Sequence, residues 1–256
     1  MTTSVDVGRL ETLHVEIRHV SAKRPLEWLK RGWDDLKRIG WPGLAHGALI
    51  AILGGVLLAL GSTHMYLTAA AVTGYLLVGP VMTTGLCELA RRREAREPIG
   101  FDESLQALTR NPDGLLHFGG ILGLIALVWF VLSAVLLESM LSAPVPSLAV
   151  ALWGGASVLT PGQALGYVAC GGVLAAIVFG LSVMAVPLII DRHARASEAM
   201  RASLRATFAN IPAMVVWAGI IVVVTAIGFL TLLIGMVVVA PVLGYATWHA
   251  YRDLIG

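Results

Sequence analysis

Three histidines are the side chains of this sequence best placed to hold a metal. His46, His117 and His249 each lie near the same end of a separate apolar segment, and Cys87 and Glu88 lie at a similar depth. If these segments converge, imidazoles with a thiolate or a carboxylate could ligate zinc, copper or a haem iron. The alternative, ordinary hydrogen bonds to headgroups or helix ends, is favoured, and no cofactor is expected.

Catalytic motifs are missing from the sequence. It contains no G-x-S-x-G, no H-E-x-x-H, no P-loop lysine pattern and no Rossmann fingerprint. The centres of the apolar segments offer hydroxyls such as Thr73, Ser133, Ser182 and Thr225, and no charged residue that could relay protons or bind a driving cation. We therefore expect that the protein is not an enzyme, and ion-coupled transport is disfavoured.

Membrane helices must position these residues, because the chain is too apolar for one soluble core. Of its 256 residues, 57% are hydrophobic and 13% are charged. A span takes about 20 apolar residues. The predicted fold is an all-α polytopic membrane helix bundle over residues 44–252, preceded by a cytoplasmic segment, residues 1–43. Its six transmembrane helices form three hairpins, with bounds at about 44–62, 65–90, 115–137, 164–190, 211–230 and 235–251.

The distribution of basic residues predicts the orientation. All 18 Lys and Arg fall in the N-terminal segment, two charged loops and the C-terminus, and none falls in the three opposite connections. Since positively charged loops remain in the cytoplasm, both termini are expected there.

The N-terminal segment predicts an amphipathic helix. Leu26, Leu29, Trp33 and Leu36 recur at helical spacing, and Pro25 suits a first helical turn. We expect this helix to lie on the bilayer, with its cations facing anionic headgroups. The residues predicted at the membrane surface are Trp28, Lys30, Arg31, Trp33, Lys37 and Arg38. The alternative is a helix docked on the protein's own cytoplasmic loops.

Prolines and a short repeated motif indicate internal duplication. Pro80, Pro187 and Pro241 lie in the second helix of each predicted hairpin and predict kinks. The pattern S-L-x-A-x-x-x-N occurs at residues 104–111 and 203–210, each time shortly before a proline and an apolar helix. We interpret the chain as three parallel copies of a two-helix hairpin.

Glycine pairs at helical spacing predict close helix approach. The pairs are Gly43-x-x-x-Gly47, Gly119-x-x-x-Gly123 and Gly162-x-x-x-Gly166. Such spacing lets two backbones touch, either within one chain or between chains. We interpret them as packing within the chain.

Several longer motifs resemble one known family. They are the segment 19–36 with its H-V-S and P-L-E-W-L-K-R-G-W-D-D-L runs, Gly74-Tyr75-x-x-x-x-Pro80, and the ending 240–254. Together they resemble, over nearly the whole chain, the bacterial integral-membrane family known as domain of unknown function 2189. The resemblance implies a bacterial inner-membrane protein and carries over no catalytic residue. Some members are labelled as relatives of a cytochrome oxidase subunit, but mid-membrane histidine ligands for haem and copper are missing here.

Three hypotheses about function follow. The first is a non-catalytic accessory, assembly or scaffold component of a membrane complex. The second is a carrier or channel for an uncharged or amphiphilic solute or a lipid, and the third is a metal- or haem-binding membrane protein. The expected partners are anionic lipid headgroups and other membrane subunits or a second copy of the chain, and not nucleic acid.

Overall fold

The described part of the chain is helical. The computed structural model describes residues 15–61, 79–140 and 160–256, which form α-helices, turns and one isolated antiparallel bridge between Ile17 and Ile255. The predicted all-α class is confirmed for these residues. The helices are α1 (Arg24–Ile39), α2 (Trp41–Gly61), α4 (Thr84–Ala95), α5 (Phe101–Leu105), α6 (Ala107–Arg110), α7 (Pro112–Met140), α9 (Pro161–Ser182), α10 (Ala185–Asp191), α11 (Ala196–Ala209), α12 (Ile211–Leu230) and α13 (Met236–Leu254).

Three stretches of the described residues are long and apolar enough to cross a membrane. They are Pro112–Met140, Pro161–Asp191 and Ile211–Leu230, and a fourth is reached if α1 and the first part of α2 form one bent span. The prediction of six spans is therefore supported only in part. Most of the predicted second helix lies outside the described residues, and α13 falls short because its last turns carry polar and charged side chains.

The candidate spans expose large apolar faces. The most exposed of these side chains belong to α7, α9 and α12 and include Leu116, Leu124, Leu165, Val173, Val215 and Val222, each at least 61% exposed. Apolar surface of this extent is unfavourable in water and is stable against lipid. The faces that α7 and α9 turn towards each other are buried, and there Ser133 shares a 2.6 Å hydrogen bond with the hydroxyl of Tyr167.

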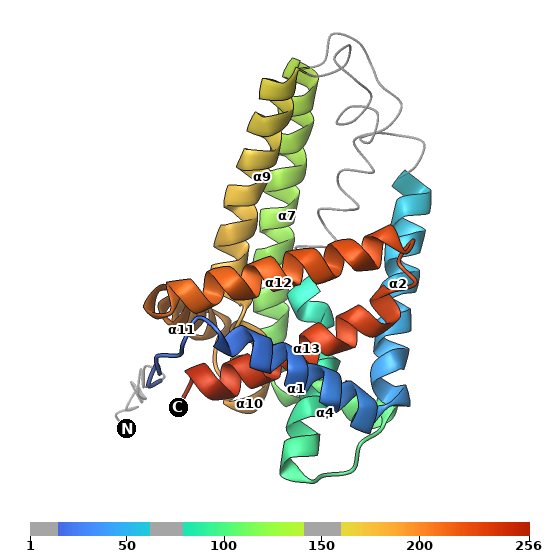
Figure 1. Ribbon diagram of the computed structural model, residues 1–256, viewed down its shortest axis with the longest axis vertical. Helices are drawn as coiled ribbons and strands as arrows, with labels where there is room; N and C mark the ends of the chain where they lie inside the picture. Colours follow the sequence, from blue (N-terminus) through green and yellow to red (C-terminus); the bar gives the residue numbers. More distant parts are fainter. Residues whose placement is uncertain (1–14, 62–78, 141–159) are drawn as a thin grey trace, which may run out of the picture.

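Most of the other helices gather at one end of α7 and α9 (Figure 1). We call this group, which consists of α1, α4–α6, α10, α11 and α13, the basal helices. Helix α13 is central to this group, because it packs against α1, α2 and α4. Figure 1 shows α12 running across the direction of α7 and α9, and it packs against α13 and α1. Trp28 of α1 meets Trp217 of α12 edge to face, with ring centroids 5.9 Å apart.

Close glycine contacts hold α13 against its neighbours. A Cβ at Gly47 of α2 would overlap the backbone carbonyl of Val237, and one at Gly244 would lie 2.7 Å from the Cβ of Leu86 in α4. The first predicted glycine pair therefore packs within the chain. The glycines of the other two pairs are open: apart from one ordinary contact at 3.8 Å from Gly119, no described atom lies within 4 Å of the Cβ position.

The three predicted kinks have different outcomes. Pro187 lies in α10, just after Val183 and Met184 interrupt the helix begun by α9, so a break is present there. Pro80 lies in a short helical turn directly before α4. Pro241 lies inside α13, which continues on both sides of it without a break. The break before α10 is bridged by the hydroxyl of Ser203 from α11.

Candidate functional site: a buried ion-pair network

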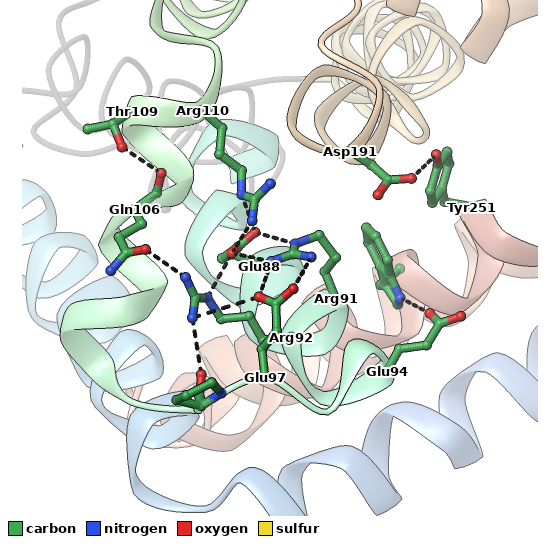
Figure 2. Close-up of polar contacts among 12 residues, drawn as sticks. Glu88, Arg91, Arg92, Glu94, Glu97, Gln106, Thr109, Arg110, Asp191 and Tyr251 are labelled. Atoms are coloured by element: carbon green, nitrogen blue, oxygen red, sulfur yellow. Dashed lines mark hydrogen bonds and ion pairs between the residues drawn. The ribbon is translucent and has the colours of Figure 1, made fainter.

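A cluster of charged side chains surrounds Glu88 of α4. Glu88 is fully buried, and its carboxylate accepts hydrogen bonds from three guanidinium groups. Arg91 and Arg92, one turn along the same helix, donate through Nε at 2.9 and 2.8 Å. Arg110, from the end of α6, donates through Nη2 at 3.2 Å. Figure 2 shows the three arginines converging on this one carboxylate, which joins α4 to α6.

The turn after α4 completes the cluster. Helix α4 ends at Ala95 and is followed by Arg96, whose φ of 57° is left-handed, and then by Pro98. This turn brings Glu97 back to Arg91, whose Nη2 donates to it at 2.6 Å. The hydrogen bond from Arg91 lowers the pKa of the Glu97 carboxyl and keeps it ionised. Arg92 donates its remaining N–H groups to Gln106 and to the carbonyl of Pro98.

The Glu88 cluster has an excess of positive charge. Three arginines face two carboxylates, which leaves one formal positive charge at neutral pH. The Nε of Arg110 lies 3.0 Å from a Glu88 oxygen, but its N–H is not directed at it and finds no hydrogen-bond acceptor. Ion pairs of this density fix the relative positions of the helices that carry them.

A second cluster joins three helices that are distant in sequence. Asp35 of α1 is buried, and it pairs with Arg93 of α4 and with the Nε2 of His249 in α13, at 2.9 Å from the latter. Beside it, Glu94 of α4 accepts a hydrogen bond of 2.8 Å from the indole of Trp248. These contacts attach both α1 and α13 to α4.

Asp253 near the end of α13 forms a third cluster with α1. Arg24 donates to it at 2.6 Å, the indole of Trp28 at 2.8 Å and Arg31 at 3.4 Å. Burial by itself raises the pKa of this carboxyl, but the hydrogen bonds from Arg24 and Trp28 outweigh burial and hold the pKa below its ordinary value. Asp253 is therefore ionised at neutral pH and anchors the start of α1.

The structure does not bring the three candidate histidines together. His46 is buried and bonds to Ser104 at 2.7 Å. His117 is exposed and bonds to the carbonyl of Asp113 in its own helix, whereas His249 bonds to Asp35. Among the described residues, no three His, Cys, Asp or Glu side chains are grouped so that they could hold a metal ion.

The predicted membrane-surface residues divide into two groups. Trp28 is fully buried against the protein, so this assignment is corrected. Arg31 pairs with Asp253 at 3.4 Å, but its side chain is 39% exposed, and its assignment stays a prediction. Lys30 and Lys37 are exposed, as is Arg38, and Trp33 is 45% exposed. Helix α1 thus packs through one face mainly on α13 and α12, rather than on the cytoplasmic loops of the alternative interpretation, and its opposite face remains exposed.

Sequence reasoning missed Asp35 and Asp253, which organise two of the three clusters. The spacing of Glu88, Arg91 and Arg92 at i, i+3 and i+4 is a local signal for the first cluster. Asp35 gave no such signal, because its partners lie 58 and 214 residues further along the chain.

Comparison with known proteins identifies the family over part of the chain. Residues 67–191 match the family model described as a predicted integral membrane protein, DUF2189. The match includes the motif from Gly74 to Pro80, whereas the motifs at 19–36 and 240–254 lie outside it. No curated protein and no solved structure matches the chain. The Glu88 cluster falls within the matched segment, and residues 67–191 of this chain are thus similar to the DUF2189 family of predicted integral membrane proteins, the family that the sequence predicted.

Proposed function

We propose that this protein is a non-catalytic accessory, assembly or scaffold component of a membrane complex in the bacterial inner membrane. The observation that carries the proposal is the clamping of the basal helices by the three ion-pair clusters. Their partners come from α1, α4, α6 and α13, which are far apart in the sequence. A rigid group of charged basal helices at one end of apolar spans is suited to a protein that holds other subunits in fixed positions.

The energetics of buried ion pairs support a rigid base. Glu88 and Asp35 are at most 3% exposed, so neither carboxylate has water to replace a lost partner. Removing one partner of such a pair costs about 3–5 kcal/mol. Any rearrangement of α1, α4 or α13 that separated these charges would meet this cost, which favours one fixed arrangement.

The proposal also places both termini in the cytoplasm, but it does not keep six spans, because α13 lies among the basal helices and α12 runs across the direction of α7 and α9 (Figure 1). The basic side chains of α1, α4, α6, α11 and α13 gather at one end of α7 and α9. This supports placing that end of the molecule on the cytoplasmic side. The repeated motif supports duplication, because its two serines, Ser104 and Ser203, are both fully buried. Asn111 and Asn210 each follow a basal helix, precede a candidate span and donate to backbone carbonyls of a distant segment.

A carrier for an uncharged or amphiphilic solute or a lipid is the second candidate. The break between α9 and α10 favours it, because interrupted helices line substrate sites in many transporters. Proteoliposomes that show no solute flux and no lipid scrambling would argue against this candidate.

Gentle purification from native membranes tests the first proposal. The tag is placed at the N-terminus, away from Gly256, whose carbonyl accepts a hydrogen bond from Arg192 at 2.7 Å. We expect membrane proteins to co-purify at fixed stoichiometry, and not from control cells with the untagged chain. A solitary monomer, together with unchanged membrane complexes in a deletion strain, would overturn the proposal.

A further inference from the structure

Helix α1 is attached at its two ends to the beginnings of two apolar helices, α2 and α12. At its C-terminal end, Gly40 leads directly into α2. Before its N-terminal end, the backbone N–H of Val20 donates to Asn210 at 2.8 Å, and Asn210 donates in turn to the carbonyl of Arg18 at 3.1 Å. Asn210 is the residue immediately before α12. The C-terminal end of α1 therefore lies at the depth where α2 begins, and its N-terminal end is held at the start of α12.

The direction of α1 agrees with a position in the plane of the membrane. Helices α1 and α2 differ in direction by 109°, so α1 lies nearly flat when α2 crosses the bilayer. Gly40 makes this turn with φ 68° and ψ −125°, a conformation that side-chain-bearing residues rarely adopt. Its N–H still bonds to the carbonyl of Leu36, which ends α1 cleanly.

The two faces of α1 differ in their surroundings. Trp28, Gly32 and Ile39 are buried against the protein. The opposite face carries Leu26, Lys30, Trp33 and Lys37, which share one side of a helix because they follow each other at intervals of four, three and four residues. Leu26 is 58% exposed and Trp33 is 45% exposed, and neither has a place in the core.

Helix α11 continues this surface at the other side of the Asn210 junction. The Nδ1 of His19 lies 3.0 Å from the carbonyl of Ala209, the last residue of α11, so the two helices meet there. Arg201, Arg205 and Phe208 lie on one exposed face of α11, and Phe208 is 66% exposed. The same combination of cations and large apolar side chains therefore occurs on both sides of the start of α12.

We propose that α1 lies in the membrane interface and binds anionic phospholipid headgroups through Lys30 and Lys37, with Leu26 and Trp33 in the acyl boundary. Lysines on an interfacial helix extend their charge towards phosphate while their stems cover apolar surface. The Nζ of Lys37 lies 5.7 Å from the centroid of the Trp33 ring and pairs with the half-exposed Asp34 at 3.2 Å, so its charge stays at the surface beside the indole. The α11 face provides further cations for the same headgroup layer.

Depth-dependent fluorescence quenching tests the position of α1. The full chain is reconstituted in vesicles of phosphatidylcholine and phosphatidylglycerol, with and without bromine on the acyl chains. We expect Trp33→Phe to remove a larger part of the bromine-dependent quenching than Trp248→Phe, since Trp248 is buried beside Glu94. Equal losses for the two variants would overturn the proposal.

Lipid-dependent stability tests the headgroup contact. We expect phosphatidylglycerol to raise the Tm of the wild-type chain above its Tm in phosphatidylcholine alone, and Lys30→Gln with Lys37→Gln to reduce that rise by half or more. Arg96→Gln is the control, because Arg96 is an exposed cation in the turn after α4. An undiminished rise in the double variant would overturn headgroup binding. This inference does not depend on the scaffold proposal, since a chain without protein partners would still show both effects.

Discussion

The hydroxyl of Ser203 donates a hydrogen bond of 2.8 Å to the backbone carbonyl of Gly180. The same hydroxyl accepts one of 3.1 Å from the N–H of Met184. In a continuous α-helix the N–H of residue 184 would bond directly to the carbonyl of residue 180. A side chain from α11 thus takes the place of one main-chain hydrogen bond and makes the break between α9 and α10 depend on α11.

Ser203→Ala is expected to destabilise the protein. The substitution leaves the N–H of Met184 and the carbonyl of Gly180 without their common partner, and an unsatisfied buried group costs about 1–3 kcal/mol. We expect a lower Tm in detergent and faster hydrogen exchange at the amide of Met184.

Ser197→Ala is the matched control for this prediction, because Ser197 is an exposed serine of the same helix. If the Ser203 variant kept the Tm and the exchange rate of the Ser197 variant, the hydroxyl would not hold the break.

Glu88→Gln is expected to be the most disruptive single change in the Glu88 cluster. It removes the carboxylate on which Arg91, Arg92 and Arg110 converge and leaves their charges facing each other in a buried site. The expected cost is about 3–5 kcal/mol. Urea or thermal unfolding of the purified protein measures it, with Asp102→Asn as a control at an exposed carboxylate of α5.

Arg110→Gln provides a second measurement if the Glu88 variant fails to fold. Arg110 is 28% exposed, and its replacement still leaves Glu88 with two arginine partners. We therefore expect a smaller loss of stability, of about 1–2 kcal/mol. A Glu88 variant as stable as the Asp102 control would contradict a structural role for the cluster.

Strong local patterns predicted several helices well. The predicted bounds 211–230 coincide with those of α12, because Asn210 and Pro212 mark its start and the run that follows contains no charge. Helix α7 contains the whole predicted segment 115–137, whereas the predicted segment 164–190 is divided between α9 and α10 by the break at Val183 and Met184. Apolar length alone determines these elements.

Contacts between distant segments limited the prediction elsewhere. The stripe from Leu26 to Leu36 was expected to be the apolar face of α1, yet the buried face includes Asp35, because Arg93 balances its charge and His249 forms a hydrogen bond with it. The direction of α12 across α7 and α9 likewise depends on packing against α1 and α13. Periodicity contains no information about such partners.

Gly47→Ala is expected to separate α2 from α13. A Cβ at residue 47 would overlap the backbone of Val237, which cannot move away as a flexible side chain could. We expect a loss of about 1–3 kcal/mol, typical of overpacking. Gly55→Ala in the same helix is the control, since no described atom lies within 4 Å of a Cβ there, and it should leave the Tm unchanged or slightly higher. Equal Tm values for the two variants would argue against close packing of α2 on α13.

The contact between Asp253 and α1 should depend on pH in a defined direction. The pKa of Asp253 is lowered in the folded protein by Arg24 and Trp28, against the opposing effect of burial. A carboxyl with a lowered folded pKa contributes stability that is fully present above its unfolded pKa, about 3.9, and is lost as the pH falls through the folded pKa. Asp253→Asn should therefore reduce stability at pH 7, by about 1.5–3 kcal/mol for a hydrogen bond to a charged group.

Below about pH 4 the difference between the two proteins should begin to shrink, and it should vanish only once the pH is below the lowered pKa of the folded wild-type carboxyl. The free energy of unfolding of both proteins, measured in urea between pH 3 and pH 7, gives this difference directly. Asp34→Asn is the control for the loss of one negative charge, because Asp34 lies on α1, the helix that Asp253 binds. Asp34 is half exposed and, among the ion pairs of the described residues, pairs only with Lys37. A difference between wild type and Asp253→Asn that stayed constant over this range would mean that Asp253 stabilises α1 through packing and not through its charge.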